Sequence, residues 1–183
     1  MDDLGAPAAY FSGERIDLVA LEKGDLPRVA SWINDERIGF FNGARFPVSL
    51  AEQEAWFEGT VRDRTKKKLV IRTREGELAG MVSLFNLDAK NQNAEVGVYV
   101  APEFHRRGYA AEALRMLVRF AFAELNLHKV YCTIFSFNPG SVRLFESVGF
   151  RPDGVRRGHV YAAGGFHDVL CYAMFRADFA ARG

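Results

Sequence analysis

The sequence predicts a single domain of the α/β (α+β) class, with a mixed, mostly antiparallel central sheet of about seven strands and helices on both faces. Two observations lead to this class. Apolar runs occur in hairpin-like pairs, of which Leu69–Thr73 and Leu78–Phe85 are the clearest. One long amphipathic segment, by contrast, separates the apolar runs Glu95–Val100 and Val130–Phe135, as a crossover helix would. A sheet with both kinds of connection is mixed.

Before that hairpin, the first half of the chain is predicted to hold one strand and two helices. Ile16–Leu21 is an apolar run of strand length. Asp25 is a suitable N-cap for a helix that ends near Asn34. Ser49–Glu52 is a capping box, in which a serine and a glutamate three residues later satisfy each other's backbone N–H groups. It predicts the start of the second helix.

The second half begins with the long helix, whose apolar residues recur at helical spacing on one side: Leu114, Leu117, Val118, Ala121 and Leu125. Asn138 is the predicted N-cap of a short helix with Pro139 in its first position, and Gly149 ends that helix. Two closing strands are expected near Phe150–Gly158 and Phe166–Phe175. The chain thus contains elements of both types throughout, without a linker or repeat.

The composition is that of an ordinary globular protein. The chain has 183 residues, of which 49% are hydrophobic and 26% charged, and its formal net charge is +1. This is enough to build one sizeable core. The small net charge favours neither a nucleic acid nor a membrane surface as partner. The sequence has no run of 18 apolar residues and no apolar leader, so we expect a cytoplasmic protein.

Residues 1–183 are predicted to be a single domain, in which residues 1–12 form a flexible N-terminal extension. Cys132 and Cys171 each lie in an apolar run and are expected to be buried free thiols. The four histidines have no metal-ligand spacing with either cysteine, so no metal site is predicted.

A turn rich in small and basic residues connects the strand Glu95–Val100 to the long helix. It contains Arg106, Arg107, Gly108 and Ala110. The first N–H groups of a helix have no partner within the helix and lie at the positive end of its dipole, so they bind anions such as phosphate. Gly108 lets an anion approach the backbone because it has no Cβ. The turn therefore predicts a phosphorylated ligand.

This unit resembles the pyrophosphate loop of the GNAT superfamily of acyl-CoA-dependent N-acetyltransferases, Gln/Arg-x-x-Gly-x-Gly/Ala, with His105 in place of the first Gln or Arg. The later part of the same fold is matched by Asn138, Ser141, Leu144, Phe145, Glu146, Gly149 and Phe150. Residues 164–168 resemble its closing hairpin. The outline extends over Arg15–Phe175 and is most similar to the branch of ribosomal-protein N-terminal, spermidine and amino-sugar nucleotide acetyltransferases.

The resemblance implies that acetyl-CoA is the cosubstrate and that the reaction uses no metal. Val98 and Val100 would lend backbone atoms to the acetyl and pantetheine groups. Asn138 would bind the pantetheine arm, although a role as helix N-cap has at least equal support. Ser141 and Phe145 would lie near the cofactor. The pyrophosphate would be held by the loop residues His105, Arg106, Arg107, Gly108, Tyr109 and Ala110.

Glu95 is the predicted general base. On a strand, Glu95, Gly97 and Tyr99 share one face, and a glycine beside the carboxylate leaves room for a substrate. An amine attacks a thioester only when it is neutral, so a carboxylate that accepts its proton is useful. The alternative is that Glu95 marks the polar start of the strand and pairs with a surface arginine.

Many GNAT enzymes have a tyrosine as general acid where this chain has Phe145. A thiol has a pKa near 8.5, so a thiolate leaves without much assistance. Ser141, one turn earlier, is the second predicted catalytic residue, through a hydrogen bond to the thiolate or a proton relay through water. A purely structural role for Ser141 is the alternative, and Tyr99 and Tyr131 are less favoured donors.

The predicted acceptor is a primary amine. By resemblance, helices of the N-terminal half line the acceptor cleft, with Trp32, Asn34, Asp35 and Trp56 as substrate-binding residues. A protein N-terminal α-amine is the acceptor that best suits a site with weak acid and base residues. A polyamine and an amino-sugar nucleotide are the alternative acceptors. A catalytically silent acyl-CoA-binding module and, more remotely, an unrelated nucleotide-binding protein also stay open. A homodimer is one assembly that the sequence leaves open.

Overall fold

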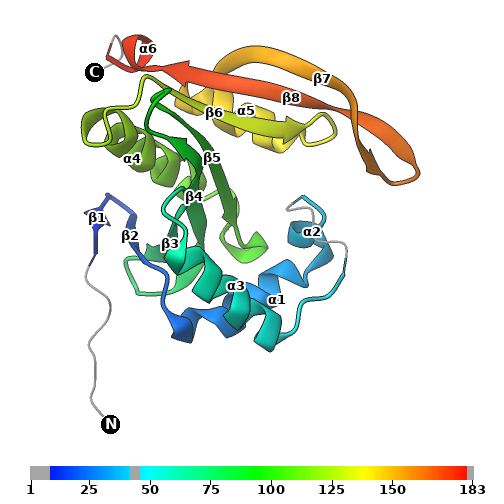
Figure 1. Cartoon of the computed structure of the whole chain (residues 1–183). Helices are drawn as coiled ribbons and strands as arrows, with labels where there is room; N and C mark the ends of the chain where they lie inside the picture. Colours follow the sequence, from blue (N-terminus) through cyan, green and yellow to red (C-terminus); the bar gives the residue numbers. More distant parts are fainter. Residues whose placement is uncertain (1–8, 42–45, 181–183) are drawn as a thin grey trace.

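An eight-stranded sheet in the order β1-β2-β3-β4-β5-β6-β8-β7 forms the centre of the protein (Figure 1). The computed structural model describes residues 9–41 and 46–180. The strands are β1 (Phe11–Ser12), β2 (Ile16–Ala20), β3 (Lys67–Thr73), β4 (Leu78–Asp88), β5 (Asn93–Val100), β6 (Lys129–Phe135), β7 (Arg151–Ala162) and β8 (Gly165–Phe175). The helices are α1 (Leu26–Ile33), α2 (Glu36–Gly39), α3 (Leu50–Arg62), α4 (Tyr109–Ala123), α5 (Pro139–Val148) and α6 (Arg176–Ala180), with 3-10 turns η1 (Lys23–Asp25) and η2 (Pro102–Phe104).

The predicted fold class is confirmed, with eight strands in place of about seven. The additional strand is β1, in the segment predicted to be a flexible extension, where Phe11 pairs with Leu18 and Ser12 with Asp17. The Phe11 ring also packs edge-on against Phe120 of α4, with 5.0 Å between ring centroids. A strand of two residues is too short to produce a hydrophobic period, so the sequence pattern could not reveal it. Residues 1–8 of the predicted extension lie outside the described residues.

Pairing in the sheet is antiparallel except between β5 and β6, which are parallel and are joined through α4. The crossover helix predicted from the sequence is therefore present. It forms because one side of α4 is apolar and becomes fully buried, whereas the opposite side carries charged residues. The buried residues of α4 are Ala113, Leu114, Leu117, Val118, Ala121 and Phe122.

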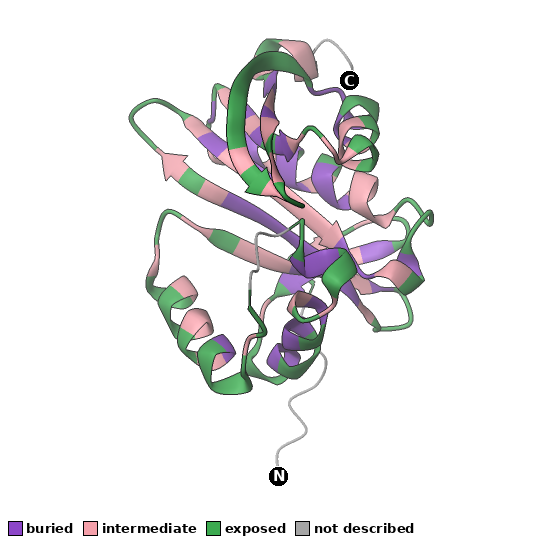
Figure 2. Cartoon of the chain, turned by 90° about the vertical axis from the view of Figure 1, so that its right-hand side faces the viewer, coloured by how far each residue is buried: buried purple, intermediate pink, exposed green. Residues whose placement is uncertain are grey.

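Helices cover both sides of the sheet. Trp32 of α1 stacks edge-on against Tyr99 of β5, with 5.6 Å between ring centroids, so α1 covers the face that carries the odd-numbered side chains of β5. α4 packs against β5, β4 and β2, and α5 packs beside α4. The strands β7 and β8 form a long hairpin, and β7 is exposed along most of its length (Figure 2). Among the described residues, no helix is long and apolar enough to cross a bilayer.

Three of the four predicted helix caps, those of Ser49, Asn138 and Gly149, are confirmed. Ser49 Oγ accepts the Glu52 N–H at 3.2 Å, while a Glu52 carboxylate oxygen accepts the Ser49 N–H at 2.8 Å. Gly149 ends α5 with a positive φ of 116°. Asp25 stands before α1 but its carboxylate does not cap that helix: it accepts the Glu22 N–H at 3.0 Å and binds Arg72 at 2.6 Å. The 3-10 turn η1 precedes α1 directly, so Asp25 has helical rather than extended backbone angles.

Of the two cysteines, Cys132 is buried and Cys171 is half-buried, and both are free thiols. Burial raises the pKa of the Cys132 thiol. A thiol that stays protonated is a poor nucleophile, which supports its interpretation as a small apolar residue.

Candidate active site

The strands β5 and β6 separate after a short paired stretch. Their pairing ends at Glu95 and Tyr131, although β5 continues to Val100 and β6 to Phe135. The gap between them exposes the backbone edge of β5. Ala101 N–H donates to Ala79 O of β4 at 2.8 Å. Because the N–H groups along a strand alternate in direction, those of Val98 and Val100, beyond the paired stretch, face the gap instead.

Glu95 lies where the gap begins, and both of its carboxylate oxygens accept hydrogen bonds. Thr133 Oγ1 of β6 donates to one oxygen at 2.7 Å, and Asn86 Nδ2 donates to the other at 3.0 Å. Asn86 has a positive φ of 48° and follows Phe85, where the β4–β5 register shifts. This bulge turns the amide of Asn86 toward Glu95. The carboxylate is thus fixed from two neighbouring strands.

Gly97 does not leave the open space that the sequence suggested. A Cβ built on Gly97 would lie 2.9 Å from Cε2 of Phe85. The ring of Phe85 therefore covers the glycine and occupies the face next to Glu95.

The turn before α4 forms one wall of a pocket of about 350 Å³. The opposite wall comes from α5, so the two segments that carried the resemblance meet here. Arg106 and Arg143 supply positive charge to the pocket, and the backbone of Gly108 has a positive φ of 82°. The lining residues are Val100, Phe104, His105, Arg106, Gly108, Tyr109, Ala110, Ala111, Gly140, Arg143 and Leu144.

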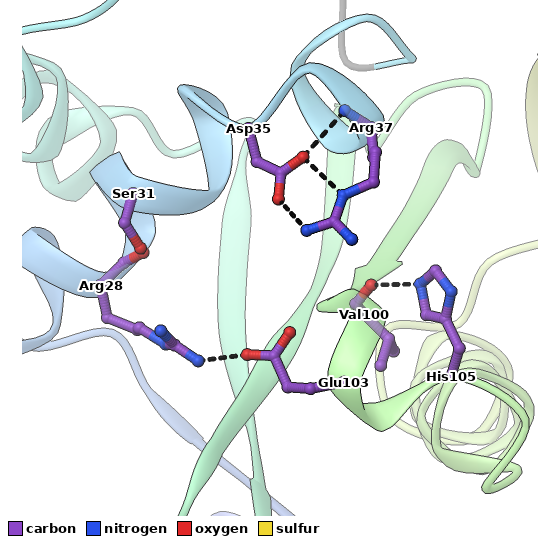
Figure 3. A network of polar contacts seen from close by, with 7 residues as sticks. All are labelled: Arg28, Ser31, Asp35, Arg37, Val100, Glu103 and His105. Atoms are coloured by element: carbon purple, nitrogen blue, oxygen red, sulfur yellow. Dashed lines mark hydrogen bonds and ion pairs between the residues drawn. The ribbon is translucent and has the colours of Figure 1, made fainter.

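The side chains of His105 and Arg107 both have partners within the protein. His105 Nε2 lies 2.8 Å from the carbonyl oxygen of Val100, so the ring ties the turn back to the end of β5 (Figure 3). Arg107 does not line the pocket, and its guanidinium stacks 5.4 Å from the centroid of the Phe104 ring. Among the six predicted loop residues, His105, Arg106, Gly108, Tyr109 and Ala110 line the pocket and Arg107 does not.

The side chains predicted on α5 lie near this pocket without lining it. Asn138 Oδ1 accepts the Ser141 N–H at 3.0 Å and so caps α5. This N-cap contact leaves the Nδ2 of Asn138 without a hydrogen-bond partner in the described parts of the chain. Phe145 is buried and packs edge-on against Phe150, with 5.1 Å between ring centroids. Its ring belongs to the core.

The four predicted acceptor-binding residues are engaged within the protein. Trp32 lies on the buried side of α1, and Lys68 Nζ lies 5.0 Å from the centroid of Trp56. Asn34 binds the backbone of Val48 through both ends of its amide, at 2.7 and 2.9 Å. Three hydrogen bonds from Arg37 to Asp35 hold the pKa of that carboxyl down at about 2 (Figure 3).

Sequence reasoning missed a cluster of aromatic rings near the gap, which comprises Phe40, Phe41, Phe135, Phe137 and His167. Phe137 is central, with its ring centroid 5.4 Å from Phe40, 5.2 Å from Phe135 and 4.9 Å from His167. The cluster joins three segments far apart in sequence, so no local pattern could reveal it. Phe40 and Phe41 remain exposed, which gives the end of α2 an apolar surface.

Comparison with known proteins assigns the family. Residues 15–151, most of the chain, match the family described as acetyltransferase (GNAT) domain. The chain belongs to the GNAT acetyltransferase family. A Bacillus subtilis protein, named provisionally as the ribosomal N-acetyltransferase YdaF, is 31% identical over 173 residues, which cover 90% of this chain and 93% of the relative.

Two solved structures extend the comparison to the fold of this GNAT enzyme. The spermidine N-acetyltransferase of Vibrio cholerae in complex with CoA and spermine has a TM-score of 0.84 at 26% identity, over 90% of this chain and 98% of that one. A dodecameric structure of spermidine N-acetyltransferase from the same organism has a TM-score of 0.79 at 26% identity, over 92% and 98%. The predicted recognition is confirmed, and the protein is an acetyl-CoA-dependent N-acetyltransferase.

The residues present fit acetyl-CoA. The α4 turn combines free N–H groups, a glycine at positive φ and the guanidinium of Arg106, which suit a pyrophosphate. The gap between β5 and β6 leaves backbone donors for an acyl-pantetheine arm. Acetyl-CoA supplies an acyl group already activated as a thioester. In the described part of the chain, no three His, Cys, Asp or Glu side chains gather in a way that could hold a metal.

Two tyrosines near the sheet are poor proton donors to a leaving thiolate. Burial raises the pKa of Tyr99, whose hydroxyl is enclosed beneath Trp32. Burial also raises the pKa of Tyr172, whose hydroxyl donates to Glu146 at 3.0 Å. Both phenols are therefore held protonated, but neither lines the pocket.

Proposed function

We propose that this GNAT enzyme acetylates a primary amine of low basicity, namely a protein or peptide N-terminal α-amine. The observation that supports this acceptor is the neutralisation of three carboxylates around the N-terminal helices. Asp35 pairs with Arg37 and Glu103 pairs with Arg28 (Figure 3). Glu54 lies 3.6 Å from Lys23. A polyamine carries several positive charges and is best bound by carboxylates that have no internal cation.

The positive charge of Lys68, on the same side of the sheet, also disfavours a polyamine. Lys68 Nζ lies between the rings of Trp56 and Phe85, at 5.0 and 4.7 Å from their centroids. No carboxylate in the described chain pairs with it. Its positive charge repels a polycation, whereas an N-terminal α-amine brings only one positive charge and loses it near neutral pH.

In the proposed reaction, the neutral amine nitrogen attacks the thioester carbonyl carbon. The N–H groups of Val98 and Val100 lie beyond the paired stretch, and one of them stabilises the developing oxyanion. The C–S bond breaks, the CoA thiolate leaves, and Glu95 accepts the proton from the amine nitrogen. No acid is needed for a leaving group whose pKa is near 8.5. Because an α-amine has a pKa of about 7.7–8.0, a weak base suffices.

A polyamine such as spermidine is the second candidate. The observation in its favour is the fold similarity to the Vibrio cholerae enzyme bound to CoA and spermine. Glu36 lines a pocket of about 540 Å³ at the end of α1 together with Phe40 and Phe46, and it has no cationic partner among the described residues. A carboxylate beside aromatic rings is suitable for an alkylammonium group.

The deciding experiment measures thiol release from acetyl-CoA at pH 7 with matched acceptors. These are a peptide with a free α-amine, the same peptide with a blocked N-terminus and one internal lysine, spermidine, and an amino-sugar nucleotide. We expect kcat/KM for the free peptide to exceed that for spermidine at least tenfold, and the blocked peptide to be inactive. Preference for spermidine would replace the proposal by its alternative.

Absence of turnover with every acceptor, together with acetyl-CoA binding in calorimetry, would identify a silent acyl-CoA-binding module.

Two further expectations belong to this proposal. The compartment is the cytoplasm, in keeping with two free thiols. The homodimer stays a prediction, which sedimentation can test against the dodecamer known for the Vibrio cholerae enzyme.

A further inference from the structure

The turn between β1 and β2 lies directly against the loop before α4. Arg15, in this turn, makes three contacts with the start of the helix. Its backbone N–H donates to Glu112 Oε1 at 2.9 Å, and its Nε lies 3.3 Å from Glu112 Oε2. Its Nη1 donates to the carbonyl oxygen of Arg107 at 3.1 Å. One side chain thus bridges the first turn of α4 and the backbone of the loop.

Two glycines permit this close approach. A Cβ on Gly108 would lie 2.8 Å from Arg15 Nη1 and 3.3 Å from its Cζ, and a Cβ on Gly13 would collide with Glu112 Oε1. The space beside Gly108, which the sequence suggested for an anion, is therefore filled by a guanidinium group. The Arg15 side chain is 55% exposed and that of Glu112 is 12% exposed. The positive member of the pair faces the solvent.

Glu112 carries the wrong charge for an anion site. Its carboxylate lies in the first turn of α4, within about 5 Å along the helix axis from the free N–H groups. A carboxylate there favours the helix dipole but competes with a pyrophosphate for the same positive end. The site needs a cation that cancels this charge, and Arg15 is the only ion-pair partner of Glu112 among the described residues.

We propose that Arg15 is a positioning residue of the acetyl-CoA site, which cancels the charge of Glu112 and fixes the peptide between Arg107 and Gly108. In a planar trans peptide the C=O and the following N–H point in opposite directions. Since the Arg107 carbonyl is directed at Arg15, the N–H of Gly108 is directed away from Arg15 and Glu112. This inference rests on the proposed cofactor site, and it concerns binding of the anion rather than acyl transfer.

The test is a charge cycle with R15M, E112Q and the double variant. Through an effective dielectric constant of 20–80, one uncompensated charge at about 8 Å weakens anion binding roughly 3- to 30-fold. We expect R15M to raise KM and Kd for acetyl-CoA by this factor, with kcat and the KM for the amine almost unchanged. Adding E112Q should restore most of the affinity. The defect of R15M should also shrink in high salt, because salt screens the repulsion.

Arg74 provides the matched control. Its Nη1 binds Asp17 at 3.0 Å, its Nε donates to Glu14 O at 3.3 Å, and its Nη2 binds Gly13 O, so it holds the same turn without touching α4. R74M should leave the affinity for acetyl-CoA unchanged. An equal defect in R74M and R15M would mean that the turn acts through structure alone, and the charge inference would be wrong.

The other outcomes are equally decisive. No rescue by E112Q, or no defect in R15M, overturns the inference. If R15M does not fold, E112Q alone decides: affinity at least equal to wild type supports charge cancellation, and a loss contradicts it. Failure of this inference is distinguishable from failure of the cofactor site, because a Gly108→Val variant must still lose acetyl-CoA affinity if only the role of Arg15 is wrong.

Discussion

Glu95 combines the geometry expected of a base with contacts that fix its position. Thr133 and Asn86 each donate to one carboxylate oxygen, so the side chain is held where β5 and β6 separate. A group that both accepts a proton and is already hydrogen-bonded must exchange one of these contacts for the amine. Both donors are exposed, but only Thr133 lies across the gap on β6, so we expect its contact to be the one that a substrate replaces.

The role of Glu95 as base predicts a specific pH profile for E95Q. Glutamine keeps the shape of the side chain: its oxygen can still accept from Asn86 and its NH2 can donate to Thr133 Oγ1, but it cannot accept the proton. We expect kcat to fall at least tenfold at pH 7 and to recover partly above pH 9, where the free amine accumulates. Stopped assays of thiol release over this range measure it. A loss of equal size at every pH would show that Glu95 only positions the substrate.

Phe145 raises a second question at this scale, because the family commonly has a tyrosine there. The ring is 4% exposed and packs against Phe150. We therefore expect F145Y to keep activity within a few-fold, and F145A to lose about 3–5 kcal/mol of unfolding free energy through the cavity it leaves. Thermal melting and thiol release measure the two effects. A large gain in rate for F145Y would show that the natural enzyme lacks a needed acid.

At the scale of elements, the N-termini of α4 and α5 form the two walls of the pocket, and both were predictable. Their signals are local: a glycine before α4, and Asn138 followed by Pro139 at the start of α5. The meeting of the two helix starts was accessible only through the family resemblance. The contact of Arg15 with Glu112 was not predictable, because 97 residues separate its partners.

The glycine at position 108 can be tested against another glycine in the same pocket. Gly108 has a φ of 82°, and a side chain there would meet Arg15, whereas a Cβ on Gly140 would meet only Asn138 Oδ1, at an ordinary 3.6 Å. G108V should therefore weaken acetyl-CoA binding at least tenfold, while G140A should bind within a few-fold of wild type. Calorimetry measures both. Wild-type affinity in G108V would refute the phosphate-loop assignment.

Asn138 serves α5 through Oδ1, and its Nδ2 is available for the cofactor, so one side chain has atoms for both predicted roles. N138A removes both and should cost about 1 kcal/mol of stability, together with affinity for acetyl-CoA. N138D keeps an acceptor for the Ser141 N–H and should retain the stability, but it loses the Nδ2 donor. A higher KM for acetyl-CoA in N138D at unchanged melting temperature would establish the cofactor contact. Wild-type KM would reduce Asn138 to a cap.

For the whole molecule, the sequence predicted the fold class, the crossover helix and most strands, because these depend on local periodicity and capping. The acceptor residues stay a prediction. Trp32 is packed in the core, and Asn34 binds the backbone of Val48. Whether such a side chain faces a substrate or another part of the protein depends on residues distant in the chain. The aromatic cluster around Phe137 was missed for the same reason, since its rings come from three separate segments. Specificity thus depends on the tertiary contacts that sequence patterns show least.

The ionisation of Lys68 makes the free energy of unfolding depend on pH, and this contribution can be measured separately. Burial, with the nearby charge of Lys66, lowers the pKa of Lys68 to about 8 from its ordinary 10.5. Between these values the unfolded chain binds more protons than the folded one, so this residue makes the free energy of unfolding rise with pH. Below pH 8 both states are protonated, and the buried cation destabilises the fold by a constant amount. Cation–π contacts with Trp56 and Phe85, about 0.5–2 kcal/mol, offset part of that cost.

K68M should therefore be more stable than wild type by about 1–3 kcal/mol at pH 7, and the difference should shrink as pH rises from 8 toward 10.5. Denaturant unfolding of both proteins at pH 7 and pH 9.5 measures it. Cys132 and Tyr99, whose raised pKa values make stability fall with pH, act equally in both proteins and cancel in the difference. K67M, at the exposed neighbouring position, is the control and should change nothing. If K68M is less stable at pH 7, the attraction of the two rings for the cation exceeds the cost of burying it, and the charge at Lys68 stabilises the fold.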